Sequence, residues 1–162
     1  MRLLATTALL AVLSAGRVLA QPTTDGPSVE VTPLAERPPL IGPSDLFTGT
    51  ALIGPLFDPD GARDFGGATV AFFPGARTNW HSHPAGQTLV VTEGLGWVQA
   101  RGGARREVRA GDVVWTPPGV EHWHGGTATH AMTHTALQGA EGGEVVTWLG
   151  PVSDAEYLGA DD

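Results

Sequence analysis

Two His-x-His pairs constrain this chain more than any other feature of its sequence. The first pair is His81 and His83, and the pattern returns at His122 and His124 after a Gly-Asp-Val-Val-Trp segment and a Pro-Pro-Gly turn. On an extended strand, residues two apart leave from the same face, so both imidazoles of a pair can reach one ion. Gln87 has the same parity and adds an amide oxygen. The sequence therefore predicts a metal site where two strands bring histidines and one amide together.

From residue 46 onward, short apolar runs alternate with glycine and proline, which is the pattern of an all-β sandwich or barrel. We expect about ten strands, at residues 46–50, 51–57, 67–73, 81–92, 96–100, 106–109, 112–116, 122–125, 129–138 and 145–148. Residues 153–157 predict a capped helical turn. So many short strands favour a jelly-roll β-barrel, whose interior is wide enough for one small ligand.

The first 45 residues differ in composition from the rest. Residues 1–20 have a basic end, an apolar run and a small-residue ending, which together predict an export signal peptide. The apolar run is shorter than the roughly twenty residues that a membrane span needs, so we expect no stable membrane anchor after cleavage. Residues 21–45 are rich in proline, which predicts a linker. We therefore expect an exported protein, periplasmic or secreted, with a single domain at residues 46–162.

The charge and the cysteine content exclude several classes of function. The chain has 17 Asp and Glu against 9 Lys and Arg, a formal net charge of −8. So few basic residues cannot form a face that binds nucleic acid. The absence of cysteine excludes disulfides, thiolate ligands and cysteine nucleophiles. We expect a small-molecule substrate as the partner.

Strand parity predicts which side chains share the barrel interior with the metal. In residues 129–138, the even positions place on one face His130, Met132, His134, Ala136 and Gln138. This mixture of polar and apolar groups suits a reactive cavity and not a dry core, because buried polar groups need partners. The alternative is that this face is exposed to solvent on the outside of the sheet. By the same parity argument, an apolar wall consists of Ala68, Val70, Phe72 and Leu89.

The spacing of these residues resembles the two sequence motifs of the cupins. The first motif is matched by Gly75, His81-x-His83, Gln87 and Gly94, with glutamine where glutamate is usual. The second is matched by Gly111, Pro117-x-Gly119 and His122, with Gly126 in place of the final asparagine. The resemblance implies a single-domain cupin, a jelly-roll β-barrel, in which the metal ligands are His81, His83, Gln87 and His122.

A longer series of matches is similar to one group, the bacterial cupin hydroxynitrile lyases. The matches run from about residue 46 to 157 and include residues 46–50, 55–57, 74–78, 80–89, 111–115, 122–125 and 131–134. Members of this group depend on manganese and cleave or form cyanohydrins. The signal peptide and the proline-rich leader depart from the group. The pocket positions that the resemblance implies are Ala68, Val70, Thr78, His124, His134 and Gln138.

The proposed ligand set also has a chemical consequence. Glutamine is neutral where glutamate would be negative, so the ion keeps its full double charge and is a stronger Lewis acid. Imidazole and amide oxygen together suit Mn(II) first and Fe(II) next, with Zn(II) and Ni(II) also compatible. We assign His124 as a general base rather than a fifth ligand.

Three functions remain open at this point. The first is a lyase acting on small α-hydroxynitriles, in which His124 removes the hydroxyl proton while His134 and Gln138 bind the leaving group. The second is an Fe(II)-dependent dioxygenase acting on a small phenol or diketone. The third is a non-catalytic cupin that binds a metal or a small ligand.

The segment 46–57 is apolar enough to lie across the sheet edge of a neighbouring subunit, as is common in small one-barrel cupins. We therefore expect a homodimer or homotetramer. Pairing of this segment within its own chain is the alternative.

Overall fold

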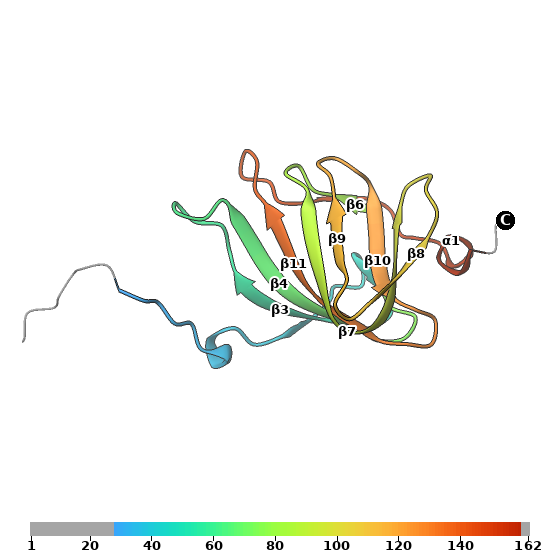
Figure 1. Cartoon of the computed structure of the whole chain (residues 1–162), viewed down its shortest axis with the longest axis horizontal. Helices are drawn as coiled ribbons and strands as arrows, with labels where there is room; N and C mark the ends of the chain where they lie inside the picture. The colour runs from blue at the N-terminus through green and yellow to red at the C-terminus, as the bar shows by residue number, and fades with distance from the viewer. Residues whose placement is uncertain (1–27, 160–162) are drawn as a thin grey trace, which may run out of the picture. The chain divides into compact units, whose positions relative to one another are not determined.

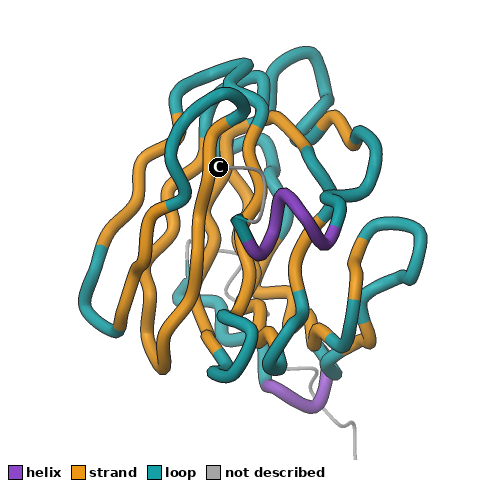
Figure 2. The backbone as a smooth tube through the Cα atoms, turned by 90° about the vertical axis from the view of Figure 1, so that its right-hand side faces the viewer, coloured by secondary structure: helices purple, strands orange, loops and turns teal. Residues whose placement is uncertain are grey.

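The computed structural model describes residues 28–159, so the predicted signal peptide (1–20) and the first part of the predicted linker lie outside the described residues. One compact unit begins at Thr32; residues 28–31 precede it and have no regular secondary structure. Figures 1 and 2 show that its elements are strands joined by loops, with very little helix. The elements are η1 (Leu34–Glu36), β1 (Leu40–Ile41), β2 (Phe47–Thr48), β3 (Ala51–Phe57), β4 (Phe65–Phe72), β5 (Arg77–Thr78), β6 (His81–Ser82), β7 (Gln87–Ala100), β8 (Arg106–Arg109), β9 (Val113–Thr116), β10 (His122–Gly126), β11 (Met132–Gly139), β12 (Thr147–Trp148) and α1 (Asp154–Leu158). The all-β prediction is confirmed.

The strands form one curled antiparallel sheet, which is organised around β7 (Figure 1). The main order is β1-β3-β4-β11-β7-β10-β5-β2, with β8 and β9 also paired to β7, and β6 paired to β10 and β12. The first half of β7 pairs with β11 and β9, while its second half pairs with β10 and β8. One long strand therefore runs through both halves of the sheet, and the side chains of its two neighbours, β10 and β11, share one inner surface.

Two predicted strand boundaries were wrong near the histidines. The predicted strand 81–92 is interrupted after Ser82, because Gly86 has a φ of 78° and donates its N–H to the carbonyl of His83 (3.2 Å) in a tight turn. Conversely, the predicted break between residues 92 and 96 is absent. Gly94 lies so close to the backbone that an added Cβ would come within 2.0 Å of the Ala131 oxygen, and only glycine lets β7 continue there.

Leu34–Glu36 and Leu40–Ile41 lie inside the range predicted as linker. They form a 3-10 turn and a two-residue strand that pairs with Leu52 and Ile53 of β3. β3 is paired on its other side with β4. β2 pairs with β5, so both strands of the segment 46–57, which was expected to reach a neighbour, are paired within their own chain. The oligomeric state stays a prediction.

An apolar cluster anchors the C-terminal segment on β5 and β10, and its buried members are Trp80, Trp123, Val152 and Tyr157. Tyr157 of α1 donates its hydroxyl to the carbonyl of Gly126 (2.8 Å), and the guanidinium of the buried Arg77 lies over the Tyr157 ring at 4.4 Å. Ser153 and Glu156 form a capping box at the start of α1, which confirms the predicted capped turn. No helix among residues 28–159 has the length and apolar character required to span a membrane.

Candidate metal centre and cavity

Three strands bring the predicted metal ligands to one point. His81 on β6 lies directly across from His122 on β10, His83 follows β6, and Gln87 begins β7. The side chains of all four residues are buried. One ring nitrogen from each of the three histidines lies within 4.8 Å of the others, so this group could hold a metal ion. The histidines that strand parity predicted to converge therefore form a cluster in the structure.

Each of these imidazoles is anchored through its Nδ1 atom to a main-chain carbonyl. The bonds are His81 to Asn79 O (3.0 Å), His83 to Val145 O (2.6 Å) and His122 to Val120 O (3.0 Å). A neutral imidazole that donates its Nδ1–H carries a lone pair on Nε2, which is the atom a metal binds. Sequence reasoning missed all three carbonyl anchors, because backbone partners leave no residue-type signal.

The contact between His122 and Gln87 shows that this donor set fits a cation. Nε2 of His122 lies 3.0 Å from Oε1 of Gln87, while the single N–H of the neutral ring is donated to Val120. Two lone pairs therefore face one another. Burial lowers the pKa of His122 to about 4, so a proton does not resolve this repulsion at neutral pH. A divalent ion that accepts both lone pairs would remove this repulsion.

The other two histidines of the group are also kept neutral. Burial, followed by the nearby charge of His122, holds the pKa of His81 well below its ordinary value. Burial likewise lowers the pKa of His83, whose Nε2 has no hydrogen-bond partner. Neutral imidazoles with free Nε2 atoms are the form that binds metal.

A second histidine pair lies beside the first group. Nε2 of His134 on β11 is 3.2 Å from Nδ1 of His124 on β10, and both rings pack against Phe72. Burial lowers the pKa of His134 to about 3; burial and then the charge of His134 hold the pKa of His124 well below its ordinary value. The outer nitrogens, His124 Nε2 and His134 Nδ1, have no partner, and neither does Oε1 of Gln138. These three buried polar atoms are therefore available to form hydrogen bonds with a ligand.

These groups share a cavity of about 150 Å³. Of the predicted site residues, those that line it are Ala68, Val70, Thr78, His81, His83, Gln87, His124, His134 and Gln138. The hydroxyl oxygen of Thr78 accepts the main-chain N–H of His124 (3.2 Å), which fixes the strand that carries the second pair. The cavity is lined almost wholly by inward-facing strand residues, so the even face of β11 is interior and not solvent-exposed. The prediction was wrong for His130, which precedes β11 and is exposed.

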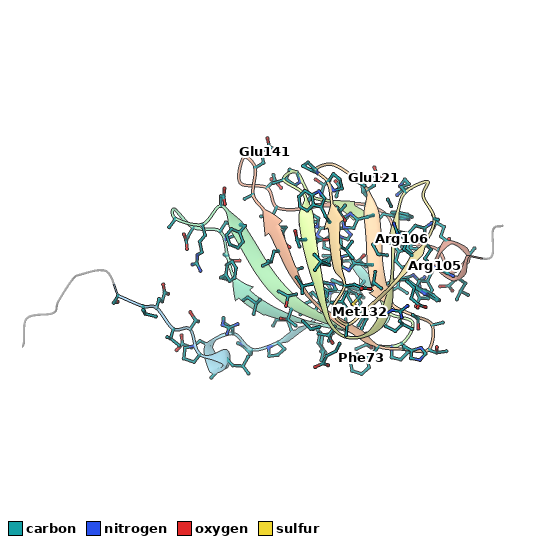
Figure 3. All side chains as sticks on the ribbon, in the orientation of Figure 1. Phe73, Arg105, Arg106, Glu121, Met132 and Glu141 are labelled. Atoms are coloured by element: carbon teal, nitrogen blue, oxygen red, sulfur yellow. The ribbon has the colours of Figure 1, made fainter. Side chains whose placement is uncertain are left out.

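Three residues predicted for the pocket lie in the core and do not line the cavity, namely Phe72, Leu89 and Met132. Parity gives the correct face for each, but it cannot give the depth along the barrel. Met132 begins β11 at one end of the sheet, whereas Glu141 lies just beyond the other end of that strand (Figure 3).

The sequence prediction missed several lining residues. They are Phe47, Ile53, Val146 and Trp148, whereas Ala136, which also lines the cavity, lies on the face predicted as interior. Each missed residue lies on or beside a predicted strand, so strand parity could have placed it on the inner face. No motif, however, marks it as part of a site.

The fold and the site together define a class: a small all-β protein with a curled antiparallel sheet and a buried histidine group suited to a metal. Comparisons with known proteins agree. The cupin domain family model matches residues 68–135. An (R)-mandelonitrile lyase of Granulicella tundricola is 53% identical over 116 residues, which cover 72% of this chain and 88% of that protein. The chain belongs to the cupin family, and its fold is the jelly-roll barrel of a single-domain cupin.

Solved structures support the same assignment. A cupin-like protein of Thermotoga maritima is 42% identical, with a TM-score of 0.71, and the match covers 74% of this chain and 91% of that one. The polyketide cyclase RemF of Streptomyces resistomycificus is 19% identical, with a TM-score of 0.62, and the match covers 83% of this chain and 94% of that one. The second likeness concerns the fold alone.

Proposed function

We propose that this cupin is a metal-dependent hydroxynitrile lyase, which cleaves or forms the bond between cyanide and the hydroxyl-bearing carbon of a small α-hydroxynitrile. The observation that carries the proposal is the shared cavity, which joins a metal-type His and Gln group to a neutral histidine pair with unpaired nitrogens. The similarity to a mandelonitrile lyase supports it.

The dimensions of the cavity favour a substrate with one ring. Its volume is about 150 Å³, and its wall is mostly apolar, with Ile53, Val70 and Val146 among the lining residues. An engineered protein cavity of about this volume with an apolar lining holds a benzene molecule. The phenyl ring of a cyanohydrin such as mandelonitrile is therefore of the right size for this space, with the polar end of the substrate directed to the histidines.

The metal would be held by Nε2 of the three histidines and Oε1 of Gln87. Mn(II) suits this mixture of imidazole and amide oxygen, and Fe(II) suits it next. When bound, the ion supplies a Lewis acid that makes a nearby hydroxyl group more acidic. The remaining steps belong to side chains of the chain itself.

One assignment of protons accounts for the second histidine pair. If Nδ1–H of His124 donates to Nε2 of His134, then His124 Nε2 is a free acceptor and His134 Nδ1–H is a free donor. His124 can then take the hydroxyl proton of the substrate. Its lowered pKa keeps the ring neutral, with the Nε2 lone pair free, at physiological pH.

Breaking the C–C bond converts the alcohol carbon into a carbonyl and releases the electron pair with cyanide. His134 Nδ1–H and the amide group of Gln138 bind the leaving cyanide. The proton held on His124 then passes to it, giving hydrogen cyanide and an aldehyde or ketone. Every atom of the substrate is accounted for, and the reverse sequence forms the cyanohydrin.

The test uses the full chain loaded separately with Mn(II) and Fe(II), and the same protein stripped of metal. With mandelonitrile, we expect equal amounts of benzaldehyde and cyanide from the loaded protein, without oxygen consumption. Oxygen uptake with a small phenol or diketone, and no cyanide release, would assign the dioxygenase function instead. Metal binding without either activity would leave a non-catalytic cupin.

A further inference from the structure

We propose that Trp148 is a positioning residue for His81 and also the wall that selects an aromatic group on the substrate. The second half of this proposal rests on the lyase function proposed above. The Trp148 ring lies 4.9 Å from the His81 ring, measured between centroids, with an angle of 37° between their planes. The same indole lines the cavity and lies 5.8 Å from the ring of Phe47. One side chain thus contacts both a predicted ligand and the substrate space.

The strand that carries Trp148 is placed to control the first His-x-His pair. β12 pairs only with β6 among the described strands, and Trp148 lies directly across from His81. Three residues earlier, the carbonyl of Val145 accepts the Nδ1–H of His83 at 2.6 Å. Residues 145–148 therefore contact both imidazoles of the pair, His83 by a hydrogen bond and His81 by ring packing.

The hydrogen bonding of His81 explains why a packed ring is needed. Its Nδ1 atom is held by the Asn79 carbonyl at 3.0 Å, but one hydrogen bond fixes one atom and leaves the ring free to tilt about it. A metal ligand needs a fixed ring plane, because the Nε2 lone pair must point at the ion. The indole of Trp148 packs against the ring at an angle of 37° and, together with the His122 ring at 4.3 Å, limits that tilt. Leucine lacks a planar face, whereas phenylalanine keeps one.

Trp148 and Phe47 also form an aromatic corner in a cavity whose other apolar walls are aliphatic. Aromatic rings prefer offset or edge-on packing with one another, and such pairs are more favourable than their buried area alone predicts. A phenyl group in the cavity gains this contact, and a methyl group does not. Removing the indole should therefore reduce activity towards aryl cyanohydrins selectively, by about tenfold.

The test compares three variants of the full chain with the parent: Trp148→Leu, Trp148→Phe and Trp97→Leu. Trp97 is a matched control, because it is a half-buried tryptophan that packs against Tyr157 and does not line the cavity. The first measurement is the visible absorption spectrum of the Co(II)-loaded protein, which reports ligand geometry without any turnover. We expect Trp148→Leu to change the spectrum, while Trp148→Phe and Trp97→Leu keep the parent spectrum.

The second measurement is the ratio of kcat/KM for mandelonitrile to kcat/KM for acetone cyanohydrin. We expect Trp148→Leu to lower this ratio about tenfold, and the other two variants to keep it within about twofold. If Trp148→Leu does not fold, Trp148→Met is used, since its flexible, unbranched side chain fills an irregular space without providing a ring, and the same changes are expected. An unchanged Co(II) spectrum together with an unchanged ratio would overturn the proposal and leave Trp148 a purely structural role. If the parent cleaves no cyanohydrin at all, the lyase function fails, and the Co(II) spectra still decide the positioning role.

Discussion

The buried histidine pair should make the metal-free protein sensitive to mild acid. Burial lowers the pKa of His134 to about 3, against an ordinary value of about 6.5 in the unfolded chain. Below pH 6.5 the unfolded chain therefore binds a proton that the folded protein does not. The stability linked to His134 is fully present above that pH and is lost as the pH falls toward the folded value. The slope approaches 1.36 kcal/mol per pH unit below pH 6.5, so the loss from His134 between pH 7.5 and 4.5 is about 2.7 kcal/mol.

Urea denaturation with a chelator present, at several pH values between 7.5 and 4.5, measures this loss. His134→Gln keeps a polar side chain beside His124 but cannot take up the proton. As the pH falls, the free energy of unfolding of this variant should therefore decrease less steeply than that of the parent. The two slopes should differ by about 1.4 kcal/mol per pH unit. Removing His134 also removes a charge that disfavours protonated His124, which acts in the same direction. The exposed His130 supplies the control, His130→Gln. Parallel slopes for the parent and His134→Gln would refute the reasoning.

Three further predictions concern single positions. His124→Ala should keep the metal and lower the turnover of mandelonitrile by about two to four orders of magnitude, the usual contribution of a general base, as measured by benzaldehyde release; loss of metal would make His124 a ligand. Gln87→Glu should retain the metal but lower turnover more than metal affinity, because the added negative charge weakens the Lewis acid; titration with Mn(II) and steady-state kinetics check this. Gly96→Ala should lower the free energy of unfolding, measured by urea denaturation, by about 1–3 kcal/mol, because the new Cβ would lie 2.5 Å from the Gly125 oxygen. Gly61 has open space around it, so Gly61→Ala should leave this free energy nearly unchanged.

The metal group could be predicted from the sequence because its geometry follows from strand parity. His81 and His83 share a face, and so do His122 and His124, whatever the exact register of the sheet. The structure then places His81 across from His122. That pairing depends on long-range contacts, and the sequence implied it only through the resemblance to the cupin motifs.

Parts of the site that depend on depth or on the main chain could not be predicted. Phe72 faces inward as expected, yet it packs beneath the second histidine pair and does not line the cavity. The carbonyls of Asn79 and Val145 orient two imidazoles, but any residue type offers a carbonyl. Trp148 reaches the cavity only because β12 pairs with β6, a contact between segments far apart in the chain.

The central claim is that one divalent ion, held by the three histidines and Gln87, is required for cyanohydrin cleavage. Elemental analysis and mandelonitrile cleavage, measured on the same samples of the parent and of His122→Ala, test it most directly. We expect one ion per chain and full activity in the parent, and the loss of both in the variant, with the fold retained by circular dichroism. A His122→Ala protein that cleaves mandelonitrile at the parent's rate, or that retains a full complement of metal, would contradict the claim.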